Sequence, residues 1–553
     1  MPAIAQSSGG NQLGTEVVFA KRGLGGSGDK KYRSNPAPYP HQRDAVNHFA
    51  SPQFKSPCWL LFQMGSGKTL TALLCALELP ALGSTSPTVC VVCDKSLVGQ
   101  WAAAIRRLHC PAGFTFAVLS ANAFEKRMKA GQIPRLARDT DLLIVDEAQS
   151  FRNLTARQKE MAGAVRSFRR VLLLSGTPIV NSAQDAVGFA FLTAGRADAP
   201  LRQASAGHVL CYDPRLCPGA AKLYPSVETE VHRVPMTWPQ ALKYAASRNN
   251  STTMVLDGES WSVHRPINNR YSQALVSVLN MPFGDAETSP KMLALVANVA
   301  AGPLPAVVYS CRVERGVAPL VELLKKEGLR VGAIDGSVAS AKERTAIVRA
   351  YNGGALDVLV LSPASARGTD LLGTASFHLL EPHNNLSEER QTLARAIRLR
   401  SHAGRVFSVV HVHHYVAHAP TAACPASDGA ALEAGLREVF GEGCRYPARV
   451  IAPAVTALLA EQGGRTHDEQ QVEDNMAKAR EVDACMAEIA TGAVRMPLTE
   501  ASLEREAARE AKARAKADRK QRLGKQPAHG RAKTRAKSAA SRNAGGPYLD
   551  SAT

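Results

Sequence analysis

Short apolar runs alternate with helix-forming stretches along most of the chain. In the first half, four runs have the length and composition of buried parallel strands, and they lie at residues 59–62, 88–93, 141–145 and 171–174. The second half repeats this pattern at residues 306–309, 330–334, 357–362 and 378–382. Helical patterns separate the runs, as at residues 316–327. Strands that alternate with helices predict an α/β fold with parallel sheets flanked by helices, here in two tandem lobes.

The other segments divide the chain around these two lobes. Residues 199–290 carry few periodic signals and many Pro and Asn, so we expect them to include the connection between the lobes. The predicted parts are a flexible N-terminus at 1–36, a first lobe at 37–235, an inter-lobe linker with a helical insertion at 236–290, a second lobe at 291–420, a helical appendage at 421–500 and a basic disordered tail at 501–553.

The chain is strongly basic. Its 553 residues include 67 Lys and Arg against 48 Asp and Glu, which gives a net charge of +19 at pH 7. Between Ala501 and Asn543 there are 14 basic and 4 acidic side chains, so the tail alone carries +10. This balance favours a polyanionic partner, most commonly nucleic acid. Two interpretations of the tail stay open: a solvated solubility or localisation segment, and a nonspecific phosphate-binding arm.

The apolar and cysteine patterns indicate an intracellular protein. No segment approaches the roughly 18 consecutive apolar residues of a membrane span, and the N-terminus does not resemble a signal peptide. The eleven cysteines have no framework spacing. Cys90 and Cys93 form a CxxC inside an apolar run, without a second pair to complete a zinc site. We expect reduced, buried thiols and no membrane partner.

A candidate phosphate loop follows the first apolar run. It consists of Gly65, Ser66, Gly67, Lys68 and Thr69. The two glycines let backbone N–H groups surround a polyphosphate at the start of the next helix. Lys68 would neutralise the β- and γ-phosphates of ATP, and the Thr69 hydroxyl would hold Mg²⁺. The full pattern has another glycine where this chain has Phe62, so the match is shortened, and a plain turn is the alternative.

An acidic pair, Asp146 and Glu147, directly follows the third apolar run. An open α/β sheet places its chemistry at this end of its strands. Asp146 would hold Mg²⁺, and Glu147 would orient or deprotonate the attacking water. A helix N-terminus is the alternative reading of the pair alone. The phosphate loop upstream favours the catalytic interpretation.

Other polar residues of the first lobe are further candidates. Gln42 precedes an expected helix and would read the edge of adenine, with a surface residue as the alternative. Ser96 would either contact a nucleic-acid phosphate or cap the next helix. Ser175 and Thr177 follow the fourth apolar run and would connect the nucleotide to a nucleic-acid groove, unless they only form a turn. Trp101 is expected in the core rather than as a base-stacking platform.

Two groups of residues stand out in the second half. Gln391, Arg395 and Arg398 have the spacing i, i+4 and i+7, which predicts one helix face. They would grip a triphosphate across a cleft, with Arg395 or Arg398 as an arginine finger, and a solvated stripe is the alternative. His411 and His413 share one face of an expected strand. We interpret them as structural, because no third metal ligand with suitable spacing is evident.

The order of these motifs resembles that of superfamily II helicases, and within them the Swi/Snf-type DNA translocases. The resemblance covers residues 37–415 and rests on the phosphate loop and on residues 96–101, 146–149, 175–181 and 391–398. Local matches are similar to the nucleoside triphosphatase I branch of poxviruses and other large DNA viruses. They lie at residues 151–153, 308–310, 398–402 and 466–469.

The resemblance implies two RecA-like lobes that bind ATP and Mg²⁺ between them and move along DNA by hinge closure. It adds Gly368 and Asp370 as nucleotide-binding candidates, in a segment that is poorer in glycine than in the family. Gln149 stands where the branch often has His, which puts the link to residues 175–181 in question. The viral branch implies work in transcription with RNA polymerase or its machinery, by analogy of fold. It also implies a location in the virion and the host cytoplasm or nucleus.

Three functions compete. The first is a DNA-stimulated ATPase that translocates along DNA. The second is an RNA helicase or RNA-release factor, since a phosphate-gripping surface carries little information about the sugar. The third is a catalytically silent nucleic-acid-binding scaffold, against which the presence of Lys68, Asp146, Glu147 and Arg398 argues.

Overall fold

The structure is a computed structural model. It describes residues 16–20, 35, 38–151, 155–180, 182–213, 224–249, 251–264, 271–281, 288–338, 340–363, 370–383, 386–398, 401–404 and 408–495. The predicted basic tail and the candidate Gly368 lie outside the described residues.

The first lobe is built on an eight-stranded sheet with the order β1-β4-β3-β5-β6-β2-β7-β16. Its strands are β1 (Glu16–Ala20), β2 (Cys58–Phe62), β3 (Thr88–Cys93), β4 (Thr115–Ser120), β5 (Leu142–Asp146), β6 (Val171–Ser175), β7 (Val209–Tyr212) and β16 (Val494–Arg495). All neighbours pair in parallel except β1 with β4. The four strands predicted in this half are confirmed as β2, β3, β5 and β6.

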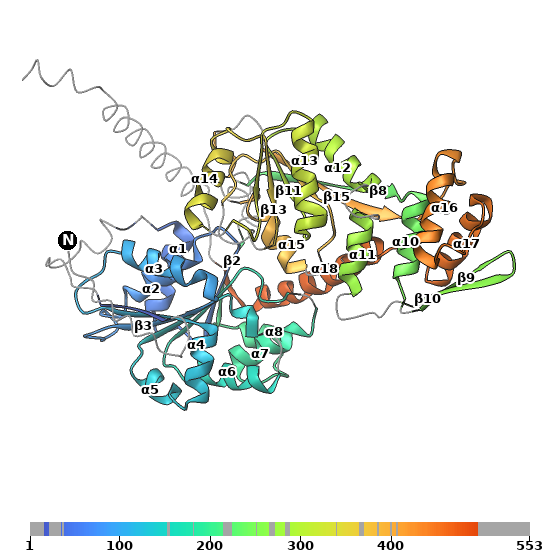
Figure 1. The fold of residues 1–553 in the computed structure, drawn as a ribbon. Helices are drawn as coiled ribbons and strands as arrows, with labels where there is room; N and C mark the ends of the chain where they lie inside the picture. Colours follow the sequence, from blue (N-terminus) through green and yellow to red (C-terminus); the bar gives the residue numbers. More distant parts are fainter. Residues whose placement is uncertain are drawn as a thin grey trace, which may run out of the picture. The chain divides into compact units, whose positions relative to one another are not determined.

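Helices cover both faces of this sheet, as the α/β prediction requires (Figure 1). They are α1 (Pro40–Ala50), α2 (Lys68–Ala76), α3 (Val98–Arg107), α4 (Ala121–Lys129), α5 (Ile133–Arg138), α6 (Ala156–Arg166), α7 (Asp185–Ala194) and α8 (Leu201–Ser205). On one face, Phe124 of α4, Val165 of α6 and Phe189 of α7 join a single apolar cluster with the strands. Strand β2 is buried at every position, because layers pack on both of its sides.

The predicted flexible N-terminus contains a strand. Residues 16–20 pair with β4 along its outer edge, and Arg127 Nη2 lies 2.6 Å from Glu16 Oε2. The prediction of a uniformly flexible segment at 1–36 is therefore wrong for β1. The reason is local composition, since the β-branched and aromatic residues of EVVFA favour a strand once an open edge is available.

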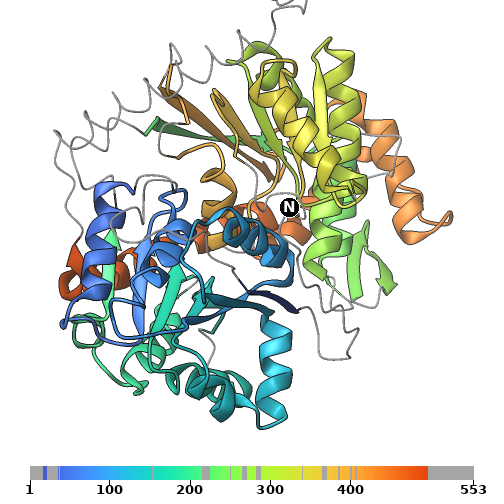
Figure 2. The same ribbon diagram turned by 90° about the vertical axis from the view of Figure 1, so that its left-hand side faces the viewer.

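The second lobe is built on a six-stranded parallel sheet with the order β12-β13-β11-β14-β15-β8. The strands are β8 (Ser226–Pro235), β11 (Ala306–Tyr309), β12 (Val331–Ile334), β13 (Val358–Leu361), β14 (Ser376–Leu379) and β15 (Val409–His418). The helices are α12 (Pro290–Ala301), α13 (Ala318–Lys326), α14 (Ala341–Asn352) and α15 (Leu386–Leu393). Figure 2 shows α12 and α13 along one face, where their apolar side chains meet Val308 and Val360.

Strand β8 corrects one predicted boundary. Residues 226–235 were expected in the first lobe, but they pair in parallel with β15 over their whole length, at the edge of the second sheet. Most of β8 is exposed, and its sequence SVETEVHRVP is polar. An edge strand with one solvated face lacks the apolar run that identifies a buried strand, so the periodic signal was weak.

Two segments that were predicted as separate parts form a third apolar core together. They contain α10 (Trp238–Ser247), β9 (Ser251–Leu256), β10 (Glu259–His264), α11 (Tyr271–Asn280), α16 (Ala426–Phe440) and α17 (Ala448–Glu461). Leu242 and Tyr244 of α10 pack with Leu436 of α16 and Val455 of α17. Each segment has only one apolar face, so it is buried by packing against the other. The helices expected at 236–290 and 421–500 are present, but the two segments pack together instead of forming a separate linker and appendage.

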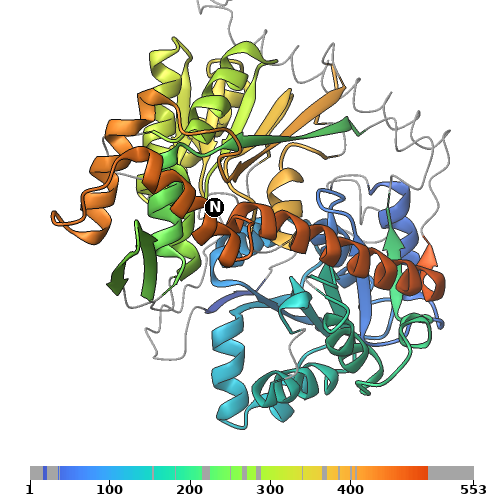
Figure 3. The ribbon, with the colours of Figure 1, turned by 90° about the vertical axis from the view of Figure 1, so that its right-hand side faces the viewer.

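Helix α18 (His467–Gly492) contacts both the first and the second lobe. Asp483 Oδ1 accepts a hydrogen bond from Arg390 of α15, and Glu481 Oε2 accepts one from the backbone of Ala183. Strand β16 follows and pairs with β7 in the first sheet, so the chain returns to the first lobe (Figure 3). Among the described residues, no helix combines the length and apolar character that a bilayer crossing requires.

Candidate functional site

The loop between β2 and α2 is shaped by two glycines in the left-handed region. Gly65 and Gly67 have φ of 79° and 80°, which residues with a side chain rarely adopt. A Cβ on Gly65 would lie 2.8 Å from Arg398 Nε, and a Cβ on Gly67 would collide with the amide of Gln42. Gly67 is also the N-cap of α2, so the unpaired N–H groups of the helix start lie at this loop.

Gln42 holds the loop in place. Its Nε2 lies 3.3 Å from the carbonyl oxygens of both Ser66 and Gly67, and its Oε1 accepts a hydrogen bond from Tyr39 N. The side chain is buried, so it is not the surface glutamine of the alternative reading. Both ends of the amide are engaged within the protein. In this structure Gln42 therefore positions the loop, and its contact with adenine stays a prediction.

His41 supports the same loop and was not predicted. Its Nε2 lies 3.0 Å from Ser66 O, and its ring stacks on Tyr212 with centroids 3.8 Å apart. Burial lowers the pKa of His41 to about 4, so the ring is neutral at physiological pH. The only signal in the sequence was its position beside Gln42 at a helix start.

Lys68 and Ser66 give the loop its chemical character. Lys68 Nζ donates a 3.0 Å hydrogen bond to Phe62 O at the end of β2. Burial lowers the pKa of Lys68, and the carboxylates of Glu147 and Asp146 oppose this shift. Ser66 Oγ is buried and has no hydrogen-bond partner among the described residues. A cradle without room for side chains, an unsatisfied hydroxyl and a buried ammonium fit the phosphates of a nucleotide.

The acidic pair is held at the end of β5. Asp146 Oδ2 accepts a 2.7 Å hydrogen bond from Trp101 Nε1, and Oδ1 accepts one from Glu147 N. Burial, together with the charge of Glu147, raises the pKa of Asp146 to about 6, against the Trp101 hydrogen bond and Lys68. Trp101 is 2% exposed, which confirms its place in the core. Its contact with the acidic pair is a role that the sequence did not reveal.

Glu147 has an unusual backbone and a fixed side chain. Its φ of 50° lies in the left-handed region, which costs a residue of this kind about 1 kcal/mol or more. Gln149 Nε2 donates a 2.5 Å hydrogen bond to Glu147 Oε2. The glutamine that departs from the family pattern thus orients the carboxylate that would act on water. The backbone strain at Glu147 is consistent with a functional position.

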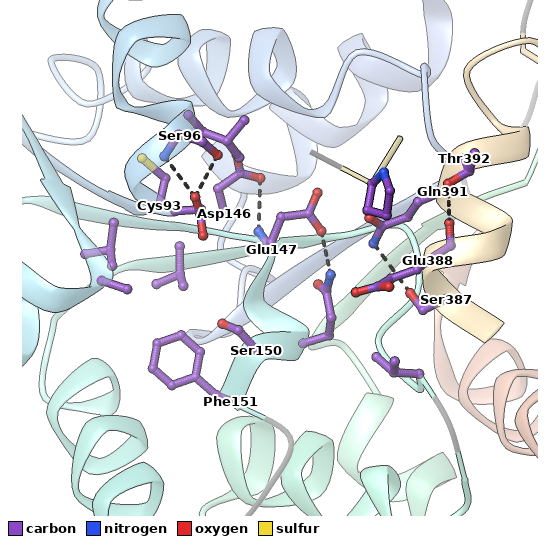
Figure 4. Close-up of a pocket in the computed structure, with 18 of the residues that line it drawn as sticks. Cys93, Ser96, Asp146, Glu147, Ser150, Phe151, Ser387, Glu388, Gln391 and Thr392 are labelled. Carbon is purple, nitrogen blue, oxygen red and sulfur yellow. Dashed lines mark hydrogen bonds between the residues drawn. The ribbon is translucent and has the colours of Figure 1, made fainter. Parts of the chain in front are cut away.

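A cleft of about 360 Å³ opens at the acidic pair between side chains of both lobes (Figure 4). Its polar lining includes Asp94, Ser96, Asp146, Glu147, Gln149, Ser387, Glu388, Gln391 and Arg395. Thr177 Oγ1 lies 3.1 Å from Ser387 Oγ, and Gln391 Nε2 lies 3.4 Å from the same hydroxyl. Polar groups of α15 therefore meet the first lobe next to Glu147.

The prediction that Arg395 and Arg398 share one helix face with Gln391 is wrong. Helix α15 ends at Leu393, turns follow it, and the backbone carbonyl of Arg395 accepts a hydrogen bond from Leu371 N outside the helix. Arg395 lines the cleft with Gln391. Arg398 lies against Gly65 of the phosphate loop and forms an ion pair with Asp370. The arginines therefore reach two different parts of the site.

The nucleic-acid candidates are placed differently from one another. Ser175 is fully buried and accepts a hydrogen bond from Thr177 N, and Thr177 Oγ1 faces Ser387. Both hydroxyls are engaged within the protein in this structure, and their link to a nucleic-acid groove stays a prediction. Ser96 is exposed, and its backbone N donates to Asp94, which caps the short 3-10 turn Lys95–Leu97, whereas the N-cap of α3 is Leu97. The capping role of Ser96 is therefore wrong, and its phosphate contact stays a prediction.

The neighbouring residue Gly176 does link this segment to the nucleotide site. A Cβ at this position would lie 3.4 Å from Lys68 Nζ. The third motif of the first lobe thus contacts the phosphate loop on one side and α15 on the other, through Thr177. A relay between the nucleotide site and a nucleic-acid groove through this segment stays a prediction.

The fold and the site define a two-lobed α/β protein, with a phosphate loop and an acidic pair in one lobe and arginines supplied by the other. Comparison with known proteins agrees. Residues 127–198 match the SNF2-related domain, and residues 292–400 match the helicase conserved C-terminal domain. In these segments the chain is similar to Swi/Snf-type superfamily II helicases, including a viral one, as its motif order predicted. Helicase domains of these kinds indicate an ATP-hydrolysing enzyme.

Individual relatives are distant. The chain is 25% identical over 287 residues to the "Putative ATP-dependent RNA helicase L538" of Acanthamoeba polyphaga mimivirus, and the match covers 47% of this chain and 64% of that protein. The chain thus spans less than two thirds of the length of this relative. The Pyrococcus furiosus Hef helicase domain is 16% identical with a TM-score of 0.42, over 69% of this chain and 95% of that domain.

Proposed function

We propose that this protein is a nucleic-acid-stimulated ATPase that uses ATP hydrolysis to translocate along DNA. The observation that carries the proposal is the meeting of the two lobes at the phosphate loop, where Arg398 lies against Gly65. Lys68 and the acidic pair lie on the first-lobe side of this junction. An ATPase of this class needs groups from both lobes around the phosphates, so that binding and hydrolysis change their relation.

The residues divide the chemistry among them. Thr69 and Asp146 would hold Mg²⁺, which would supply positive charge to offset that of the phosphates. Glu147, oriented by Gln149, would accept the proton of the attacking water. Lys68 and Arg398 would stabilise the negative charge that develops on the phosphoryl group. Gln391 and Arg395 line the cleft, and Gln391 contacts Thr177 of the first lobe indirectly, through Ser387. Through these contacts, binding of nucleotide would change how the two lobes meet.

The test is steady-state ATP hydrolysis without nucleic acid and with single-stranded DNA, duplex DNA and RNA. Lys68→Ala is expected to reduce the stimulated rate on the order of 100-fold or more. Lys159→Ala, an exposed lysine on α6, is the matched control and should retain the rate. Wild-type activity in the Lys68 variant would show that the phosphate loop is not the site. Absence of hydrolysis with every activator would favour a silent scaffold.

RNA is the second candidate substrate, because the mimivirus relative is described as an RNA helicase. Stronger stimulation by RNA than by duplex DNA in the same assay would select it. For either substrate, we further propose a role in viral transcription together with RNA polymerase. Co-purification of the polymerase with the tagged chain from infected cells would test that role.

A further inference from the structure

Strands β8 and β15 bring histidines and glutamates together on the second sheet. In their parallel register, Glu230 lies opposite His413, and His232 lies opposite Tyr415. Residues at alternate positions of paired strands project to the same side of a sheet. His232 therefore joins Glu230 and His413 in one cluster, which the separation of these residues in the sequence concealed.

Three potential ligand atoms converge in this cluster. His232 Nε2 lies 2.9 Å from His413 Nδ1, and Glu230 Oε2 lies 3.6 Å from His232 Nε2 and 3.5 Å from His413 Nδ1. In a tetrahedral zinc site with bonds of about 2.0–2.2 Å, neighbouring ligand atoms are about 3.3–3.6 Å apart. The triangle thus has nearly the dimensions of one face of a zinc coordination sphere.

We propose that Glu230, His232 and His413 bind a divalent transition metal, preferably Zn²⁺, with water in the fourth position. Two imidazoles and a carboxylate form a ligand set that Zn²⁺ accepts. The side chains of Glu230, His232 and His413 are 64%, 20% and 15% exposed, so an ion can reach the site from solvent. This site lies apart from the phosphate loop and the acidic pair, and the proposal does not depend on the proposed function.

The surroundings hold the two imidazoles in place. The His413 ring stacks on His378 with centroids 4.6 Å apart, and the His232 ring stacks on Tyr415 at 4.8 Å. Tyr415 Oη in turn contacts His378 Nδ1 at 3.0 Å and accepts a hydrogen bond from Asn298 of α12. Fixed ring orientation is what the supporting shell of a metal site supplies.

The metal would fasten the edge of the second sheet. Strand β8 is the outermost strand, and it follows β7 of the first sheet along the chain. Ligands from β8 and β15 on one ion would cross-link the strand that enters the second lobe to its neighbour. A hydrogen bond between the two imidazoles without any metal is the competing explanation of the 2.9 Å separation.

Metal titration of the full chain distinguishes these explanations. The protein is prepared without a histidine tag, stripped with a chelator and titrated with Co²⁺, whose visible absorption is intense in a tetrahedral site. We expect one equivalent to bind and to be displaced by Zn²⁺. Glu230→Gln should weaken binding tenfold or more, and because this side chain is exposed the variant should keep its fold.

His411→Ala is the matched control. His411 lies on the same face of β15 and contacts Glu228 at 3.2 Å, but the cluster that could hold an ion does not include it. This variant should bind Co²⁺ as the wild type does. No tetrahedral absorption in the wild type, or equal binding by wild type and Glu230→Gln, would overturn the proposal. Loss of binding in the His411 variant to the same extent would also overturn it, because the site would then lie elsewhere.

A second measurement compares the thermal stability of these proteins with and without Zn²⁺. Zn²⁺ should raise the thermal midpoint of the wild type and of His411→Ala, and at the same Zn²⁺ concentration it should raise that of Glu230→Gln less. A similar rise in all three proteins would assign the stabilisation to other ligands and contradict the proposed site.

Discussion

The indole nitrogen of Trp101 donates a 2.7 Å hydrogen bond to Oδ2 of Asp146, so helix α3 holds the acidic end of β5. The other carboxylate oxygen is bonded to the backbone N of Glu147. The indole bond favours the charged form of a carboxylate whose pKa burial raises. Trp101 therefore helps to keep Asp146 in the form that binds a metal ion.

Replacing Trp101 by Phe should weaken Mg²⁺ binding more than it slows catalysis. The aromatic ring keeps the core filled, while the hydrogen bond to Asp146 is lost. Loss of such a supporting partner typically costs about 10- to 100-fold in metal affinity. We expect the Mg²⁺ concentration for half-maximal ATP hydrolysis to rise by that factor, with most of the rate restored at saturating Mg²⁺. An unchanged Mg²⁺ requirement would contradict this role.

Gly67→Ala should disrupt nucleotide binding through the shape of the loop. The substitution adds a Cβ at φ of 80° and drives it into the amide of Gln42. We expect the affinity for ATP to fall tenfold or more in a fluorescent-nucleotide titration, since left-handed strain alone costs about 1 kcal/mol or more. Gly163→Ala is the control, because its Cβ on α6 would meet no atom within 4 Å. Equal affinity of the two variants for ATP would contradict the assignment of this loop as the nucleotide-binding site.

His41 should make the protein sensitive to acid. Its folded-state pKa is about 4 because of burial, whereas an unfolded histidine has 6.5. Below pH 6.5 the unfolded chain binds a proton that the folded chain does not, so stability falls between about pH 6.5 and pH 4. The loss from this residue is up to about 3 kcal/mol, at about 1.4 kcal/mol for each unit of pKa.

His41→Phe isolates this contribution. The Phe side chain can stack on Tyr212 but has no titrating ring. Near pH 7.5 the variant should be less stable than the wild type, because it lacks the contact of His41 with Ser66 O. The difference should shrink or reverse by pH 4.5 when urea midpoints are compared. Other buried histidines such as His383 and His414 titrate in both proteins and cancel. A difference that is constant with pH would refute the assignment.

The ion pair between Lys291 and Asp468 should be a major source of stability. Lys291 Nζ lies 2.8 Å from Asp468 Oδ2, and the two side chains are 1% and 0% exposed. Asp468 also accepts a hydrogen bond from Ala417 N, so it connects α12, β15 and the start of α18. Lys291→Met leaves the carboxylate buried without its partner and should destabilise the protein by about 3–5 kcal/mol in urea unfolding.

An exposed pair provides the comparison. Lys129→Met removes a 2.9 Å contact with Glu125 in which the lysine is 67% exposed, and this should cost less than about 1 kcal/mol. The double variant Lys291→Met/Asp468→Leu should recover most of the stability that the single change loses. If both lysine variants behave alike, the buried pair is not special. The similarity of residues 466–469 to the viral branch would then need an explanation other than this ion pair.

The sequence by itself was sufficient for the features that depend on neighbouring residues. Buried parallel strands such as β2 and β5 appear as continuous apolar runs, and the phosphate loop and acidic pair follow them directly. Backbone conformation and strand ends impose these patterns locally, so they can be recognised without a tertiary model. The two-lobed α/β organisation and the similarity to SNF2-related and helicase C-terminal domains followed from the order of such local features.

Only the tertiary structure decided the relationships between distant segments. The sequence predicted a helix face for Arg395 and Arg398, but the helix ends at Leu393, and the carbonyl of Arg395 bonds to the distant Leu371 N. The polar edge strand β8 belongs to the second sheet because β15 offers a free edge, and this pairing places His232 beside His413. Periodicity reports the local environment of a segment, whereas partners far apart in the chain are selected by packing and backbone hydrogen bonding in the folded state.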